Sequence, residues 1–308
     1  MFKGVNHVGI GVSDMDKSLK FYGDLLGFTE VMFDYTGPLP GMERVTGKPE
    51  IKARVVMLEN QNTAPVGLGM IKLVQLLPPD KPGPIPDGTY WGEIGVAEIA
   101  VSTRGVPEKF SELVLKGAKA LMPPSSGCFP PYDTSGSFAY VADPDGGKVE
   151  LMDWSEMCPG LGTEPKTAGL NHVAFGVSDM DKSLKLYREL GFTELIFDYN
   201  GYIDGMAIWF PEPVRMRLIM MANYYGATIE PCQHFPPSKD LRGSWGHLGP
   251  MEFAVGISNL DKAYEELQRK GIKFLSPPQT VEVSSGQWKY AYVVEPDNLY
   301  VSLIEPRY

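Results

Sequence analysis

The chain has 308 residues, of which 43% are hydrophobic and 21% charged, which is enough apolar material for two ordinary domain cores. Its formal net charge of −10 comes without a cluster of lysine or arginine residues, which argues against nucleic acids and anionic membranes and favours a small molecule or metal as partner. No apolar stretch reaches the roughly 20 residues of a membrane span, and the first residues lack the apolar core of a signal peptide. The three cysteines form no disulfide framework and no paired zinc motif. We therefore expect a cytoplasmic protein.

The chain contains a long internal repeat. Residues 4–37 return as residues 169–201, with 24 of 33 aligned positions identical and one residue skipped. The period of about 165 residues is the size of a domain rather than of a solenoid unit. We therefore predict two homologous halves, residues 1–157 and 168–308, joined by a linker at about 158–167. The molecule would be a pseudo-dimer within one polypeptide, with further homo-oligomerisation left open.

The repeated segment opens with a strand and a helix. Val8, Ile10 and Val12 alternate with polar or small residues, and apolar residues at helical spacing follow from Met15 until Gly27 ends the helix. Strand-like runs then follow at 29–35, 53–59 and 70–77. The first module is therefore a βαβββ unit, and its copy in the second half has the same pattern.

A weaker version of this unit begins at Trp91 in the first half and at Trp245 in the second. Helices are predicted at 107–116 and 260–270, and the last strands at 140–152 and 292–305. The sequence thus predicts an α+β protein of four βαβββ modules, at about 1–77, 90–155, 168–235 and 247–306.

Four such modules, a histidine in the first strand, and the segment Asp-Pro-Asp-Gly-Gly-Lys-Val-Glu-Leu at 143–151 resemble the vicinal oxygen chelate superfamily. That superfamily includes glyoxalase I, methylmalonyl-CoA epimerase, extradiol dioxygenases, and the fosfomycin and bleomycin resistance proteins. The resemblance covers nearly the whole chain. It implies that the modules pair into cupped mixed sheets holding one divalent metal ion, while substrate and reaction differ among members.

Metal ligands in this superfamily lie in the first and last strands of a module, so the resemblance points to eight positions. The first-strand positions hold His7, Glu98, His172 and Glu252. The last-strand positions hold Lys72, Glu150, Glu230 and Ser302. Glu230 is aligned with Lys72 only through matching segments on either side, so this alignment is less direct than the others.

Strand periodicity gives an independent argument for a binding cup. His172 shares its face with Ala174 and Gly176, and Glu98 shares its face with Ala100 and Ser102. A polar residue flanked by small side chains leaves a hollow, whereas the bulky opposite face packs on the helix. Two alternatives stay open: the face simply meets water, or the histidines of the two Asn-His dipeptides have structural roles.

Two pairings of modules would place different residues together. Pairing within a half joins His7 and Lys72 to Glu98 and Glu150. Pairing across the halves, as in a fused domain-swapped dimer, joins His172 and Glu230 to the same two glutamates. We favour the second, because one cup then holds one histidine and three carboxylates, while Lys72 and Ser302, which bind metal poorly, fall together in the other. The predicted metal ligands are therefore His172, Glu98, Glu150 and Glu230, with His7 replacing His172 under the first pairing.

An oxygen-rich set with one imidazole suits one divalent ion such as Mn²⁺, Zn²⁺, Ni²⁺ or Mg²⁺, whereas Fe(II) dioxygenases more often use two histidines and one carboxylate. A Lewis-acidic ion would chelate adjacent oxygens of a substrate, and Glu230 is the candidate general base. His247, aligned with Glu93, could touch the substrate or could be a surface histidine.

Three functions remain open. The leading one is a metal-dependent lyase or isomerase acting on a small or aromatic oxygenated metabolite by chelation and glutamate-assisted proton transfer. The second is an extradiol-type ring-cleaving dioxygenase using non-haem Fe(II). The third is a resistance protein that binds a drug or metabolite without turnover. No Arg/Lys cluster marks a glutathione or coenzyme A site.

Overall fold

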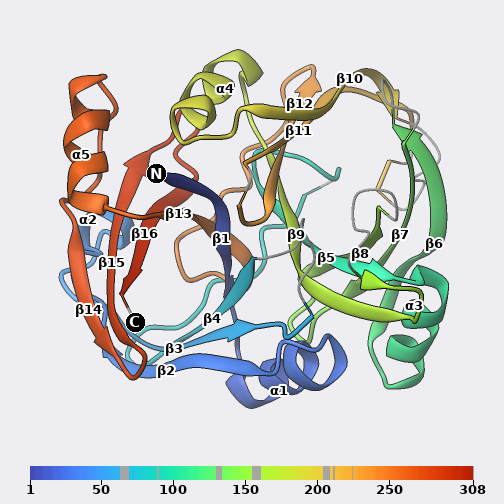
Figure 1. The fold of residues 1–308 in the computed structure, drawn as a ribbon, viewed down its shortest axis with the longest axis horizontal. Coiled ribbons are helices and arrows are strands. Elements are labelled where there is room, and N and C mark those ends of the chain that lie inside the picture. Colours follow the sequence, from blue (N-terminus) through green and yellow to red (C-terminus); the bar gives the residue numbers. More distant parts are fainter. Residues whose placement is uncertain are drawn as a thin grey trace.

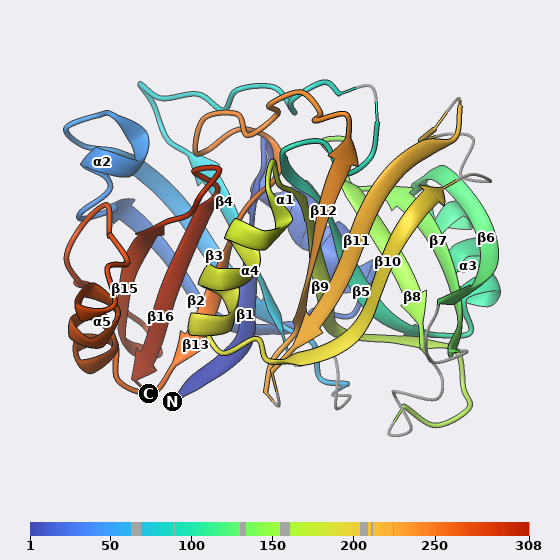
Figure 2. The ribbon, with the colours of Figure 1, turned by 90° about the horizontal axis from the view of Figure 1, so that it is seen from above.

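The computed structural model describes residues 1–62, 69–88, 90–129, 134–154, 161–203, 209–210, 212–223 and 225–307. Within these ranges the chain forms two eight-stranded mixed sheets that curl side by side (Figures 1 and 2). Cys158 and the beginning of the predicted linker lie outside the described residues.

The strands of the first sheet are, in spatial order, β14 (Gln279–Val283), β15 (Gly286–Val294), β16 (Tyr300–Arg307), β13 (Gly249–Ile257), β1 (Phe2–Gly11), β4 (Met70–Leu76), β3 (Lys52–Glu59) and β2 (Glu30–Pro38). Those of the second are β10 (Glu194–Ile203), β11 (Val214–Ala222), β12 (Thr228–Phe235), β9 (Lys166–Gly176), β5 (Gly95–Arg104), β8 (Lys148–Asp153), β7 (Thr134–Ala142) and β6 (Lys119–Phe129). The helices are α1 (Met15–Leu19), its continuation η1 (Lys20–Leu25), α2 (Glu43–Thr46), α3 (Val106–Leu115), α4 (Met180–Glu189) and α5 (Leu260–Arg269).

The order of the strands confirms the prediction of four βαβββ modules, and it shows that they pair across the two halves. At the centre of the first sheet, β1 of the first module runs antiparallel to β13 of the fourth. At the centre of the second sheet, β5 of the second module runs antiparallel to β9 of the third. Each sheet therefore takes one module from either half, which is the swapped arrangement.

The buried apolar residues of the described chain fall into three clusters. The largest lies between the two sheets, where the bulky faces of the central strands meet each other and the helices. Phe175 of β9 stacks on Phe253 of β13 there, with ring centroids 5.0 Å apart. The two smaller clusters line the concave faces of the sheets, one in each cup. The predicted alternation holds: Val8 and Ile10 are in the central cluster, whereas His7 faces a cup.

The first helices of the two halves differ at the residue that the repeat skips. In the second half α4 is a regular α-helix, but in the first half α1 passes into η1, a π-helix. The amide of Leu26 accordingly donates to the carbonyl of Phe21, five residues earlier, over 3.2 Å. A π-helical turn accommodates one extra residue without moving the flanking strands, so the insertion is absorbed inside the helix.

Turns of one sheet touch the other sheet. Asp145, in the turn between β7 and β8, accepts a hydrogen bond from the amide of Ser13 over 3.0 Å. Asp297, in the turn between β15 and β16, accepts one from the amide of Ser178 over 2.9 Å. These related contacts link the modules that do not share a sheet.

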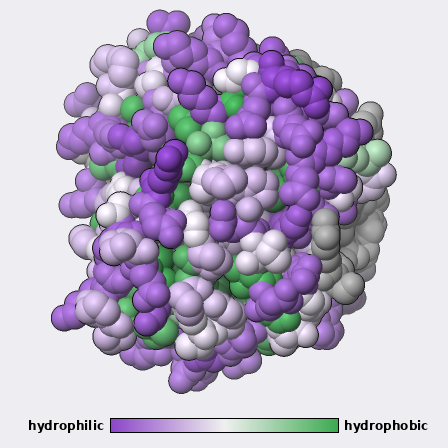
Figure 3. All heavy atoms as spheres, turned by 90° about the vertical axis from the view of Figure 1, so that its left-hand side faces the viewer, coloured by the Kyte–Doolittle hydropathy of each residue, from purple (hydrophilic) through white to green (hydrophobic). Residues whose placement is uncertain are grey.

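The side of the molecule that carries α5 and β14 is mostly hydrophilic, with hydrophobic residues in small groups between the polar ones (Figure 3). No helix in the described ranges combines the length and apolarity needed to cross a membrane.

Candidate metal centre

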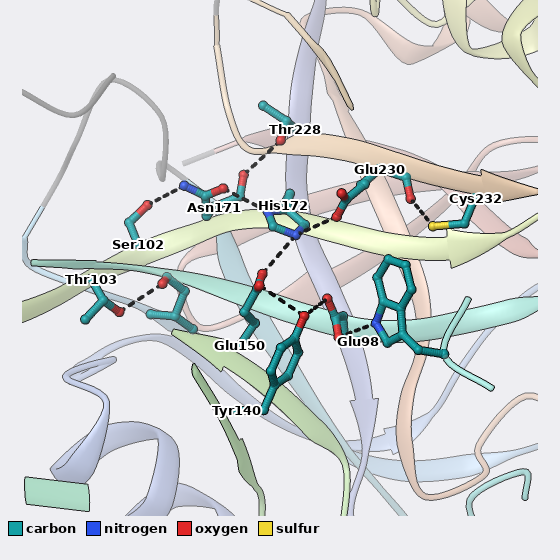
Figure 4. Close-up of polar contacts among 12 residues, drawn as sticks. Glu98, Ser102, Thr103, Tyr140, Glu150, Asn171, His172, Thr228, Glu230 and Cys232 are labelled. Carbon is teal, nitrogen blue, oxygen red and sulfur yellow. Dashed lines mark hydrogen bonds and ion pairs between the residues drawn. The ribbon is translucent and has the colours of Figure 1, made fainter. Parts of the chain in front are cut away.

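Four polar side chains project from the concave face of the second sheet around two alanines. Ala100 of β5 is paired with Glu150 of β8 on one side and with His172 of β9 on the other. Ala174 is paired with Glu98 and with Glu230 of β12 in the same way. Because neighbouring strands lie about 4.8 Å apart, this register puts all four side chains on one face within reach of each other. The structure thus brings Glu98, Glu150, His172 and Glu230 together (Figure 4).

The imidazole of His172 is held in one orientation by hydrogen bonds on the side of the ring that faces away from the cup. Its Nδ1 donates to Oδ1 of Asn171 over 2.9 Å, and Nδ2 of Asn171 in turn donates to Oγ of Ser102 over 3.0 Å. With Nδ1 engaged by Asn171, Nε2 is left pointing into the cup. Metal-binding histidines commonly have this arrangement, in which one ring nitrogen is anchored and the other is free to bind.

The carboxylates approach Nε2 of His172 closely. Oε2 of Glu230 lies 2.9 Å and Oε2 of Glu150 3.2 Å from it. One ligand atom each from Glu98, Glu150 and His172 lie within 4.8 Å of one another, and all three residues are buried. Glu230 has the carboxylate oxygen nearest to Nε2 of His172 but lies outside the set in which all ligand atoms are within 4.8 Å of one another, and with 6% of its surface exposed it is the most accessible of the four.

Two aromatic residues orient the glutamates. Nε1 of Trp91 donates to Oε2 of Glu98 over 2.5 Å. The hydroxyl of Tyr140 lies 3.1 Å from Oε1 of Glu98 and 3.0 Å from Oε1 of Glu150. The hydroxyl group of Tyr140 has one proton and can donate it to one carboxylate at a time. When both glutamates are ionised, the other needs a cation or another donor nearby. Trp91, Tyr140 and Asn171 were not among the predicted site residues, although each recurs at the matching position of the other cup as Trp245, Tyr292 and Asn6.

Burial and negative charge shift the protonation equilibria of the group. Burial, and then the charge of Glu150, raises the pKa of Glu98 well above its usual value. Burial also raises the pKa of Glu230. Burial alone would lower the pKa of His172, but the charges and hydrogen bonds of Glu230 and Glu150 raise it to about 10. In the metal-free protein the ring is therefore protonated at neutral pH.

The donor set fits a divalent cation. Three carboxyl groups and one imidazole are gathered where solvent is excluded, and such a group avoids uncompensated negative charge either by holding protons or by binding a cation. Among the described residues, Nε2 of His172 contacts no polar atom other than Oε2 of Glu150 and Oε2 of Glu230, and Oε2 of Glu150 has no hydrogen-bond partner besides its ion-pair contact with that nitrogen. Hard oxygen donors with one nitrogen are the ligands that Mn²⁺, Mg²⁺, Ni²⁺ and Zn²⁺ accept, so these residues could hold one such ion.

The equivalent positions of the first sheet form a different site. His7 and Ser302 flank Ala254, while Lys72 and Glu252 flank Gly9. Lys72 pairs with Oε1 of Glu252 where the second sheet has a further carboxylate. His7 is therefore separated from Glu98 and Glu150, and its cup holds one carboxylate that is already neutralised by lysine.

Two details differ from the expectations. Gly176 does not line a hollow: a Cβ there would lie 2.2 Å from the carbonyl oxygen of Glu93, so glycine is needed for the close approach of that backbone.

His247 is buried rather than on the surface, and its Nδ1 donates to the carbonyl of Leu248 over 2.7 Å. Its cavity is shared with Glu93 and Trp91, but His247 is not among the residues that contact the four-residue group.

Comparison with known proteins places this arrangement in a family. A lactoylglutathione lyase of Schizosaccharomyces pombe is 24% identical over 332 aligned positions, which cover 98% of this chain and 96% of the relative. The structure of glyoxalase I from Zea mays aligns with a TM-score of 0.62 at 18% identity, covering 98% of this chain and 92% of that one. A Bacillus subtilis protein provisionally assigned as a dioxygenase aligns with a TM-score of 0.63 at 13% identity, covering 99% and 85%.

These structural likenesses show that the fold extends over all four modules. The family model of the Glyoxalase/Bleomycin resistance protein/Dioxygenase superfamily matches residues 4–151 and 169–301, which span both halves. The chain therefore belongs to the Glyoxalase/Bleomycin resistance protein/Dioxygenase superfamily, as a tandem form with one carboxylate-rich cup.

Proposed function

We propose that the protein is a divalent-metal-dependent lyase or isomerase of the glyoxalase type, acting on a small or aromatic oxygenated metabolite. The observation that carries the proposal is the clustering of three buried carboxylates around the anchored imidazole of His172. The relatives named lactoylglutathione lyase and glyoxalase I support this reaction class. The substrate class rests on the adjacent oxygens that a chelating site would require.

In this proposal Glu98, Glu150 and His172 would hold the ion, and Glu230 is the fourth ionisable side chain of the cup. A bound divalent ion would supply Lewis acidity that lowers the barrier to proton abstraction beside a carbonyl group. Trp91 and Tyr140 keep the glutamates turned toward the cup, and Asn171 keeps Nε2 of His172 there.

Glu230 is the proposed base. As the most exposed of the four side chains, Glu230 would be the one best placed to take a proton from a substrate in the cup. It would take a proton from one carbon of the substrate and return it to the neighbouring carbon. No electrons are gained or lost overall, so the reaction needs no oxidant.

The number of histidines in the site favours lyase or isomerase chemistry over ring cleavage. Among the described residues, His172 is the single imidazole in the four-residue group, and non-haem Fe(II) sites commonly use two histidines. His234 is on the same strand as Glu230, but its Nε2 contacts the backbone carbonyl of Trp91 over 2.8 Å. The imidazole of His234 is thus bound to the backbone and does not join the group around His172.

The substitution Glu230→Gln tests the role of the base. We expect turnover to fall by at least about 100-fold, the lower range for loss of a general base, while one equivalent of metal is still bound. The assay supplies methylglyoxal with glutathione and follows lactoylglutathione, and it is run beside oxygen uptake with catechols. The exposed Glu266→Gln is the matched control and should behave as wild type.

A fully active Glu230→Gln variant would remove Glu230 from the mechanism. Oxygen uptake with a catechol, without lyase activity on any 2-oxoaldehyde and thiol pair, would replace the proposal with the dioxygenase alternative.

A further inference from the structure

The cup of the first sheet contains a cavity that the proposed reaction does not use. It has about 620 Å³ of free space, counting its open mouth, and its lining is mainly apolar and aromatic. Phe33 and Trp288 meet edge to face in its wall, with ring centroids 5.1 Å apart, and Trp245 and Tyr292 also line it. A mainly apolar and aromatic lining with a few polar groups is typical of small-molecule sites.

The charges in this cavity already balance. Lys72 pairs with Glu252, and Glu252 also accepts hydrogen bonds from Nε1 of Trp245, over 2.7 Å, and from the hydroxyl of Tyr292. The lysine occupies the strand position that Glu230 has in the other cup, and a fixed ammonium group there repels a divalent cation. The cup is therefore suited to a ligand that carries no net charge and brings no metal.

One polar atom in the cavity lacks a partner. Nδ1 of His7 lies 2.9 Å from Oδ1 of Asn6, an acceptor, so Nδ1 carries the ring proton and Nε2 presents a bare lone pair. Nε2 is buried and has no hydrogen-bond partner within the described part of the chain, and the histidine is 1% exposed. Burial, and then the charge of Lys72, lowers the pKa of His7 well below its usual value, so the ring stays neutral. Such an atom is satisfied only by a hydrogen-bond donor.

We propose that this cup is a second, metal-independent binding site for an uncharged aromatic molecule bearing a hydroxyl group. The ring would pack among the aromatic side chains, and the hydroxyl would donate to Nε2 of His7. The site lies in the other sheet from the candidate metal centre and goes beyond the proposed reaction, so the two proposals can fail separately.

Calorimetric titration of the intact protein tests this site, with 4-ethylphenol and ethylbenzene as probes and a chelator present throughout. We expect 4-ethylphenol to bind at one site per chain, about fivefold to tenfold more tightly than ethylbenzene, which corresponds to one net hydrogen bond. His7→Phe should remove this preference, whereas His172→Gln in the other cup should keep it. The comparison of the two probes on the wild-type protein needs no variant, so it stands even if His7→Phe fails to fold.

Equal affinities for the two probes, or a preference that survives in a folded His7→Phe variant, would contradict the role of His7. Absence of binding would show that water alone occupies the cup, and tighter binding of 4-ethylbenzoate would show that Lys72 recruits anions instead. Loss of binding in His172→Gln would move the ligand to the other cup. Each of these results would overturn the proposal.

Discussion

The hydrogen bond from His172 to Asn171 decides which ring nitrogen faces the cup. A protonated His172 donates from Nδ1, so Oδ1 of Asn171 accepts that bond while Nδ2 contacts Ser102. A structural role for the Asn-His dipeptide and a ligand role for its histidine are therefore compatible, since the asparagine prepares the histidine for binding. In the first sheet, Asn6 holds the ring of His7 in the same way, but the carboxylate in that cup, Glu252, is paired with Lys72.

We expect Asn171→Leu to weaken metal binding by about 10- to 100-fold, the usual range for losing the partner of a metal-bound histidine. Competition with a coloured chelator at fixed pH measures the affinity. Asn6→Leu is the matched control, because it makes the same change beside His7, and its affinity should equal that of the wild type. Equal losses in both variants would show that the effect comes from stability rather than from the position of His172.

Metal binding should release protons at pH 7. The pKa of His172 is raised to about 10 in the metal-free protein, despite burial, by Glu230 and Glu150. A metal ion bound to Nε2 must displace that proton, and Glu98, with its raised pKa, can release another. Calorimetric titration in buffers of different ionisation enthalpy should give at least about one proton per ion. A value near zero would mean that Nε2 of His172 is not a ligand.

Among the elements, the sequence predicts the strands and the long helices closely, and the helices expected at 107–116 and 260–270 are α3, Val106–Leu115, and α5, Leu260–Arg269. The predicted strand at 53–59 is β3, Lys52–Glu59, and the one at 70–77 is β4, Met70–Leu76. The π-helix η1 was not predicted, because one skipped residue in an alignment could lie in a helix or in a loop. The apolar spacing in the sequence predicts a helix here, but the i→i+5 backbone hydrogen bonds that distinguish a π-helical turn leave no separate mark in it.

The turn between β15 and β16 contains a buried carboxylate that should make stability depend on pH. Burial raises the pKa of Glu295 to about 7, although the side chain accepts hydrogen bonds from the amides of Asp297 and Leu299. The folded state thus holds a proton there that the unfolded state, with a pKa near 4.5, has lost. This contribution to stability is complete below about pH 4.5 and is lost as pH rises to about 7.

The change Glu295→Gln removes this dependence. Between pH 5 and pH 8 the free energy of unfolding of the wild type should fall relative to that of the variant, by up to about 3 kcal/mol for a shift of this size. Urea unfolding of both proteins at the two pH values gives the difference. An unchanged difference between the two proteins would show that Glu295 titrates normally.

At the scale of the whole molecule, side-chain patterns favour one pairing of modules without determining it. Every strand has the same apolar and polar faces in either pairing, because periodicity describes one strand and not its neighbour. Chemistry distinguishes the two pairings instead, since pairing across halves collects the carboxylates in one cup. The central pairs β1–β13 and β5–β9 have that arrangement.

The two cups also show how far two substitutions change a site, because Lys72 and Ser302 stand where the other cup has Glu230 and Glu150. Trp245 and Tyr292 hold Glu252 as Trp91 and Tyr140 hold Glu98. Lysine at position 72 nevertheless replaces a carboxylate with a cation, so one cup needs positive charge and the other already contains it. This asymmetry is the central claim of the structural account, and it predicts one metal ion per chain rather than two.

Metal content per chain after chelator-free, anaerobic purification and after titration, measured by elemental mass spectrometry, tests that claim most directly. We expect one divalent ion in the wild type, essentially none in His172→Gln, and one in His7→Gln, which makes the same change in the other cup. An ion that is lost in His7→Gln but kept in His172→Gln, two ions per chain, or no uptake by the wild type would contradict the account.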